Sequence, residues 1–120
     1  MSAQGPKGLE RIIKATFYSF SGLKLTFNNE AAFRQELFLA VILFPIGLYL
    51  GETGLEKALL TVVLFIVLIV ELLNTSVEAA IDRFGGEKHE LSRYAKDAGS
   101  AAVFISLVNV IVIWALVIFF

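Results

Sequence analysis

The last 23 residues of the chain, 98–120, contain no charged side chain. As an α-helix this segment would be about 34 Å long, which is enough to cross the hydrocarbon core of a lipid bilayer. Hydrophobic residues also make up 58% of the 120-residue sequence, well above the average for soluble domains. The sequence therefore predicts an all-α integral membrane protein that forms a single domain, residues 1–120.

Two further membrane helices are predicted, although their apolar runs are short. The run at 37–50 has only 14 residues, so a spanning helix must include residues 31–36 and cover about 31–50. The run at 58–70 reaches only about 20 Å, so the second span must continue through Glu71 and Asn74 and cover about 55–77. Residues 9–27 form a basic amphipathic segment, which is typical of a surface helix in the membrane interface. Residues 82–97 are polar and contain Gly85-Gly86, and we expect a loop there.

Glu71 is the most unusual residue of the predicted spans. A carboxylate inside an apolar membrane segment costs on the order of 2–3 kcal/mol, and such residues usually have a function. Asn74, Thr75, Glu78 and Asp82 follow Glu71 at i+3, i+4, i+7 and i+11, which places all five on one helix face. Asp82 by itself could equally be an ordinary polar residue at a helix end. We interpret the face that begins at Glu71 as the functional surface.

Basic residues are distributed asymmetrically about the predicted spans. Nine of the ten lie at or before the start of the first span or between the second and third, and Lys57 alone lies on the opposite side. By the positive-inside rule, the N-terminus and the 82–97 loop are predicted to be cytoplasmic. The polar candidates then all fall at the cytoplasmic face: Glu30, Glu71, Glu78, His89, Lys96 and Asp97.

The composition excludes several classes of site. The sequence has no Cys and a single His, so any metal would be held by carboxylates, which favours Mg²⁺ over Zn²⁺. No basic patch with interleaved aromatic residues suggests nucleic acid, and no Walker or Gly-x-Gly-x-x-Gly motif is present. Carboxylates together with a lysine suit metal-assisted phosphoryl transfer to a lipid hydroxyl. Glu71 would be the general base, Glu30 and Glu78 would bind Mg²⁺, and Lys96 would contact phosphates.

Several stretches of the sequence resemble the prokaryotic diacylglycerol kinase family. They are Asn29-Glu-Ala-Ala-Phe-Arg-Gln-Glu36, Val70-Glu-Leu-Leu-Asn-Thr-Ser-Val-Glu78, His89-Glu-Leu and Ala95-Lys-Asp-Ala-Gly-Ser-Ala-Ala102. The resemblance implies an enzyme of the bacterial inner membrane with three transmembrane helices and an N-terminal surface helix. It also implies a homotrimer that transfers the γ-phosphate of MgATP to diacylglycerol, giving phosphatidic acid. Because the polar face of the second span must face protein rather than hydrocarbon, we expect the sites to lie between protomers.

The resemblance also implies roles for individual residues. Glu71 is the expected general base, with Asn74 beside it, and Glu30 and Glu78 are the expected Mg²⁺ ligands. The residues expected to contact the nucleotide are Arg11, Tyr18, Glu30, Glu78, Glu87, His89, Lys96 and Asp97. The residues expected to contact the lipid substrate are Arg11, Ser19, Arg34, Gln35, Glu36, Glu71, Ser100 and Trp114.

Two other functions fit parts of the sequence. An undecaprenol kinase of the same fold would phosphorylate a different lipid alcohol, although the segments at 87–92 and 99–102 look more like those of diacylglycerol kinases. A small proton-coupled transporter subunit could also carry an intramembrane Glu. Such a carrier would lack the charged cytoplasmic cluster and would consume no ATP.

Overall fold

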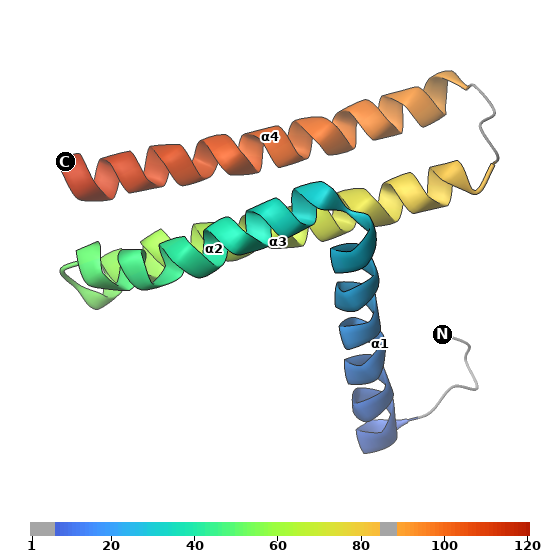
Figure 1. Cartoon of the computed structure of the whole chain (residues 1–120), viewed down its shortest axis with the longest axis horizontal. Helices are drawn as coiled ribbons and strands as arrows, with labels where there is room; N and C mark the ends of the chain where they lie inside the picture. Colours follow the sequence, from blue (N-terminus) through green and yellow to red (C-terminus); the bar gives the residue numbers. More distant parts are fainter. Residues whose placement is uncertain (1–6, 85–88) are drawn as a thin grey trace.

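The computed structural model describes residues 7–84 and 89–120, and these residues form four α-helices (Figure 1). The helices are α1 (Gly8–Asn29), α2 (Ala31–Leu50), α3 (Gly54–Asp82) and α4 (Glu90–Phe119). α3 contacts both α2 and α4, whereas α1 leaves the start of α2 at a steep angle and extends away from the other three helices. Each of α2, α3 and α4 is long and apolar enough to cross a membrane. No strand occurs in the described residues, and the predicted all-helical membrane fold is confirmed.

The turn between α1 and α2 is a single residue. Glu30 has extended backbone angles (φ −118°, ψ 108°) and separates the two helices. Arg34 stabilises this corner because its Nη1 donates hydrogen bonds to the carbonyl oxygens of Phe27 at 2.6 Å and Asn28 at 3.2 Å. These carbonyls lie in the last turn of α1 and lack partners within the helix. Arg34 therefore links the end of α1 to the first turn of α2.

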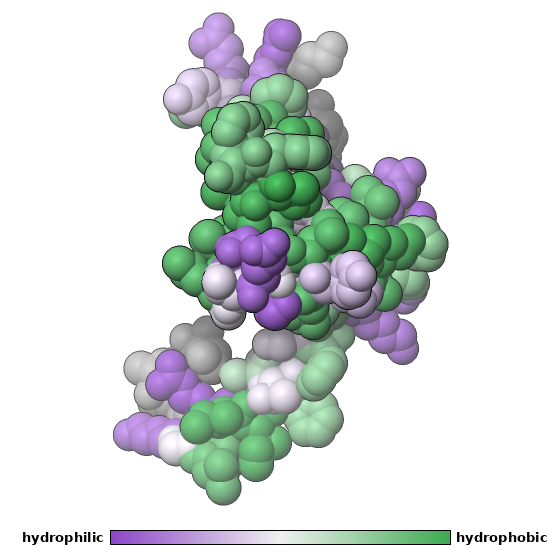
Figure 2. Space-filling view, turned by 90° about the vertical axis from the view of Figure 1, so that its left-hand side faces the viewer, coloured by the Kyte–Doolittle hydropathy of each residue, from purple (hydrophilic) through white to green (hydrophobic). Residues whose placement is uncertain are grey.

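The core of the bundle is centred on α3. Leu60, Val63, Leu64 and Val67 are buried at helical spacing, and Phe33 of α2 is also buried. Most other large apolar side chains are exposed, and hydrophobic residues cover much of the bundle when it is seen end-on in Figure 2. Exposed apolar surface on this scale is expected where helices face lipid rather than water.

Three helices meet near the end of the bundle that contains the α2–α3 turn. The Nε1 atom of Trp114 in α4 donates a hydrogen bond to the carbonyl oxygen of Leu60 in α3, at 3.0 Å. Gly47 of α2 faces the same point, since a Cβ atom there would lie 3.2 Å from Cβ of Leu60 and 3.4 Å from Cζ2 of Trp114. The missing side chain of Gly47 thus allows α2 to approach the other two helices closely.

Lys57 stabilises the α2–α3 turn and is the one basic residue at this end of the bundle among residues 7–84 and 89–120. Lys57 Nζ donates hydrogen bonds to the carbonyl oxygens of Leu48, at 2.6 Å, and Gly51. Thr53 begins α3 as its N-cap, where its Oγ1 accepts a hydrogen bond from the backbone N–H of Glu56. The charge of Lys57 therefore satisfies carbonyl groups at the end of α2.

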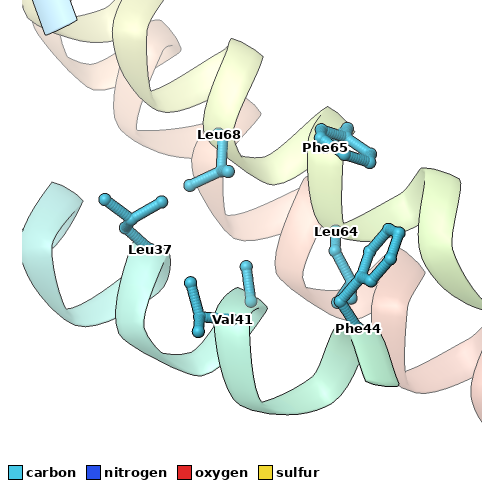
Figure 3. Close-up of a pocket in the computed structure, with 7 residues that line it drawn as sticks. Leu37, Val41, Phe44, Leu64, Phe65 and Leu68 are labelled. Carbon is cyan, nitrogen blue, oxygen red and sulfur yellow. The ribbon is translucent and has the colours of Figure 1, made fainter. Parts of the chain in front are cut away.

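An apolar groove of about 340 Å³ lies between α2 and α3 (Figure 3). Its wall includes an edge-to-face contact between Phe44 and Phe65, with ring centroids 5.9 Å apart. The lining residues are all apolar: Leu37, Ala40, Val41, Phe44, Leu64, Phe65 and Leu68. This groove suits hydrocarbon and offers no side chain that could bind a nucleotide.

We predict that Trp114→Phe destabilises the folded protein by about 1–2 kcal/mol, because it removes an interhelical hydrogen bond in an apolar environment. The midpoint of unfolding in mixed detergent–dodecyl sulfate micelles measures this loss. Phe104→Leu is a suitable control, since Phe104 is an exposed aromatic residue on the same helix. Equal stability of Trp114→Phe and the wild-type protein would show that the bond contributes nothing.

Candidate functional site

Glu71 occupies a core position of α3. It lies at the spacing that continues the buried face of Leu64 and Val67, and it is only 5% exposed. The other buried residues of α3 are apolar except Thr61, whose hydroxyl donates to the carbonyl oxygen of Lys57 one turn earlier. Glu71 is therefore a carboxyl group held inside the bundle. Its burial agrees with the sequence interpretation that this residue faces protein.

A second carboxyl group lies beside it. The side chain of Glu36 in α2 is close enough to Glu71 to interact with it directly. Oε2 of Glu36 is buried and has no hydrogen-bond partner among the described residues. Two carboxylates in contact repel each other unless a proton or a cation lies between them. The pair is therefore a natural place for proton transfer.

Asn74 and Glu78 continue the polar face of α3 one and two turns beyond Glu71. The Nδ2 atom of Asn74 donates a hydrogen bond to Oε1 of Glu78, at 3.4 Å. The Oδ1 atom of Asn74 is buried without a hydrogen-bond partner in the part of the chain that the structure describes. The amide thus restrains a carboxylate that is itself half-buried.

An ion pair joins the end of α3 to the beginning of α4. Nζ of Lys96 lies 2.7 Å from Oδ1 of Asp82, and Glu78 adds a second negative charge near the same ammonium group. Lys96 is thus brought to the end of the polar face of α3, next to the two carboxylates that follow Asn74.

α4 begins earlier than the sequence predicted. Residues 90–97 were expected in the 82–97 loop, but they form the first turns of the helix. His89 is the N-cap, and its Nδ1 accepts a hydrogen bond from the backbone N–H of Leu91 at 3.0 Å. One turn further on, Arg93 and Asp97 form an exposed ion pair at 3.9 Å. Capping and charge pairing explain why this segment is helical although it is too polar to lie in the membrane.

The chain is closely similar to several bacterial proteins. The family described as "Prokaryotic diacylglycerol kinase" matches residues 17–118. A diacylglycerol kinase of Haemophilus influenzae is 50% identical over 113 residues, covering 94% of this chain and 96% of that protein. Diacylglycerol kinases of Pseudomonas aeruginosa and Escherichia coli K12 are 47% and 43% identical, over 93% and 95% of this chain and 91% and 93% of those proteins.

The chain belongs to the prokaryotic diacylglycerol kinase family. The family recognised from the sequence motifs and the assignment as a kinase are thereby confirmed. The chain is an enzyme of the lipid kinase class. With three helices able to cross a bilayer, it is a bacterial inner-membrane protein.

A single chain of this family member places only some of the expected site residues near one another. Those on α2, α3 and α4 that lie near one another are Glu36, Glu71, Asn74, Glu78 and Lys96. Arg11, Tyr18 and Ser19 are exposed residues of α1, and Figure 1 shows that the N-terminal end of α1 points away from the bundle. The structure of one chain therefore does not show these α1 residues among that group.

The remaining expected residues have other positions. Arg34 bonds the end of α1, Gln35 and Ser100 are exposed, and Trp114 contacts Leu60. Glu30 separates α1 from α2. Glu87 lies outside the described residues.

Within residues 7–84 and 89–120, no three His, Cys, Asp or Glu side chains converge as a metal cage. Mg²⁺ does not require one, because it usually binds one or two carboxylates and takes its other ligands from water and phosphates. The carboxylate of Glu78, restrained by Asn74, is the kind of hard oxygen donor that this ion prefers. The donor set therefore fits Mg²⁺ that arrives with a nucleotide.

Two contacts of the site were missed by sequence reasoning. Glu36 was expected to contact lipid, and its contact with Glu71 was not anticipated, because no pattern within one helix reveals which faces meet. The Asp82–Lys96 pair was also missed. Its signal was available, since opposite charges stand on either side of a Gly-Gly break, at the end of one helix and the start of the next.

Proposed function

We propose that this protein transfers the γ-phosphate of ATP to the hydroxyl group of diacylglycerol, giving phosphatidic acid, with Glu71 as the general base. The observation that carries the proposal is the Glu36–Glu71 carboxyl pair inside an apolar helical bundle. Family membership supports a lipid alcohol as the acceptor, since the relatives are named diacylglycerol kinases. In phosphoryl transfer, the main contributions of the protein are to position the reactants and to accept a proton.

The surroundings of Glu36 support an apolar acceptor. A cavity of about 180 Å³ lies among α2, α3 and α4, and Glu36 is the one polar residue among those that line it. The others are Leu39, Ala40, Leu43, Leu64, Val67, Leu107, Val110 and Ile111. A lipid hydroxyl that reached the carboxyl pair from this apolar side could pass its proton to Glu71. A proton bound there also relieves the repulsion between the two carboxylates.

The nucleotide would bind where the polar face of α3 leaves the apolar part of the bundle. Glu78 and Glu30 are the proposed ligands of Mg²⁺, which would neutralise negative charge on the phosphates when bound. Lys96 supplies a fixed cation near Glu78, and Asn74 holds the Glu78 carboxylate. The other proposed nucleotide contacts are Arg11, Tyr18, Glu87, His89 and Asp97.

This arrangement requires the nucleotide end of the bundle to face the cytoplasm. Support comes from the charge distribution, because the one basic residue at the opposite end, Lys57, already bonds two backbone carbonyls. The other nine basic residues lie at or before residue 34 or within the 82–97 segment, which is the asymmetry that the positive-inside rule associates with a cytoplasmic side. The N-terminus and the 82–97 segment would then be cytoplasmic.

We further propose that the working enzyme is a homotrimer with sites shared between protomers. In one chain, α1 extends away from the bundle, and its large apolar side chains Phe17, Tyr18 and Phe20 are exposed. Residues of α1 from one protomer could complete the α3 site of another. In that trimer, the residues proposed to contact the lipid substrate are Arg11, Ser19, Arg34, Gln35, Ser100 and Trp114.

Glu71→Gln should lower the rate of lipid phosphorylation by about 10²–10⁴-fold, which is the usual effect of losing a general base. Nucleotide binding and folding should remain, because the amide has nearly the same size as the carboxyl group. Transfer of label from γ-labelled ATP in mixed micelles measures the rate. Glu52→Gln, an exposed acid in the α2–α3 turn, is the matched control. Near-normal turnover in Glu71→Gln excludes Glu71 as the base.

Glu78→Gln should raise the Mg²⁺ concentration that gives half-maximal activity by about 10-fold or more, because even loss of a group supporting a metal ligand commonly has that effect. Glu30→Gln should act in the same direction. Mg²⁺ titrations of the kinase rate measure both midpoints, with Glu52→Gln again as the control. If neither midpoint moves, these two carboxylates do not bind the ion.

Mixing two inactive proteins tests the shared site. Arg11→Glu and Glu71→Gln are unfolded together, reassembled and assayed. If α1 of one protomer serves α3 of another, random assembly leaves about a quarter of the sites without a lesion in a cyclic trimer. A comparable fraction of wild-type activity should return. Background activity in oligomers shown to contain both chains would mean that α1 and α3 of the same chain form the site.

A further inference from the structure

Gly99 of α4 lies directly against the amide of Asn74 in α3. A Cβ atom built at Gly99 would overlap Oδ1 of Asn74 and would lie 3.2 Å from its Cγ. The substitution would therefore force the amide to move, because no real side chain tolerates such an overlap. Gly22 and Gly54 are different, since a Cβ atom at either would meet nothing within 4 Å.

The amide of Asn74 is held between α4 and Glu78. Its Oδ1 faces Gly99 and is buried without a hydrogen-bond partner among the described residues. Its Nδ2 donates to Oε1 of Glu78 at 3.4 Å. A buried amide oxygen without a hydrogen bond is unfavourable, so packing against the α4 backbone must hold the amide in this orientation. If the amide were turned over, its oxygen would face the Glu78 carboxylate and repel it.

We infer that Gly99 is a positioning residue of the kinase site. Because Gly99 has no side chain, the Asn74 amide can pack against the α4 backbone in its observed orientation. In that orientation the amide holds the carboxylate of Glu78 in place. The expected effect of Gly99 on the Mg²⁺ dependence of activity rests on the proposed function, in which Glu78 binds the ion. The seating of Asn74 itself does not depend on that role.

The first test is a Mg²⁺ titration of full-length Gly99→Ala in mixed micelles. The midpoint for activity should rise by about 10-fold, as expected for a residue that orients a metal ligand. Gly47→Ala is the matched control, because its Cβ atom would also crowd a helix contact, 3.2 Å from Cβ of Leu60, but without touching a polar side chain. Its midpoint should equal that of the wild-type protein even if its stability falls.

The second test shows whether Gly99 acts through Asn74. In a protein that already carries Asn74→Ala, the Gly99→Ala substitution should cause no further change in the Mg²⁺ midpoint, because the group that it displaces is gone. This double variant also removes the overlap, so it remains available if Gly99→Ala alone does not fold. Additive effects of the two substitutions would overturn the inference.

The third measurement is independent of catalysis. The side-chain ¹⁵N–H₂ resonances of Asn74 should shift in Gly99→Ala and stay in place in Gly47→Ala and Gly22→Ala. Shifted resonances together with an unchanged Mg²⁺ midpoint in Glu78→Gln would support the seating of Asn74 and refute the metal role of Glu78. Unshifted resonances in folded Gly99→Ala would overturn the positioning role of Gly99.

Discussion

Burial of the Glu71 carboxyl group within an apolar helix is the constraint on which the rest of the structure depends. A charged residue at such a position costs on the order of 2–3 kcal/mol. α3 lies between α2 and α4, so Glu71 is shielded from lipid and meets Glu36 instead. The apolar bundle thus encloses a pair of acids whose mutual repulsion favours an incoming proton or cation.

A single helix connects this pair to the aqueous end of the molecule. From Glu71, the polar face of α3 continues through Asn74 and Glu78 to Asp82, and α4 contributes Lys96 and the backbone at Gly99. In the proposed function, the hydroxyl of an apolar substrate and a charged nucleotide approach this face from opposite directions. At the far end of the bundle, Trp114 of α4 donates a hydrogen bond to the carbonyl oxygen of Leu60 and so links α4 to α3.

The sequence predicted what depends on periodicity within one helix and on local motifs. The three apolar helices, the polar face from Glu71 and the family were all recognised in this way. Contacts between helices could not be predicted, because the spacing of residues within one helix does not show which other helix a given face packs against. The contacts of Glu36 with Glu71 and of Trp114 with Leu60 are examples. The start of α4 was missed for another reason. Its first turns are stabilised by the His89 cap and by an ion pair, and an apolar-run criterion ignores both.

The identity of the lipid acceptor is the central claim, and one assay tests it most directly. The purified protein in mixed micelles is supplied with γ-labelled ATP and Mg²⁺, and with either diacylglycerol or undecaprenol. The account predicts labelled phosphatidic acid and far less labelled undecaprenyl phosphate. Label in undecaprenyl phosphate alone would contradict the proposed substrate, and the absence of label in both lipids would contradict lipid phosphorylation itself.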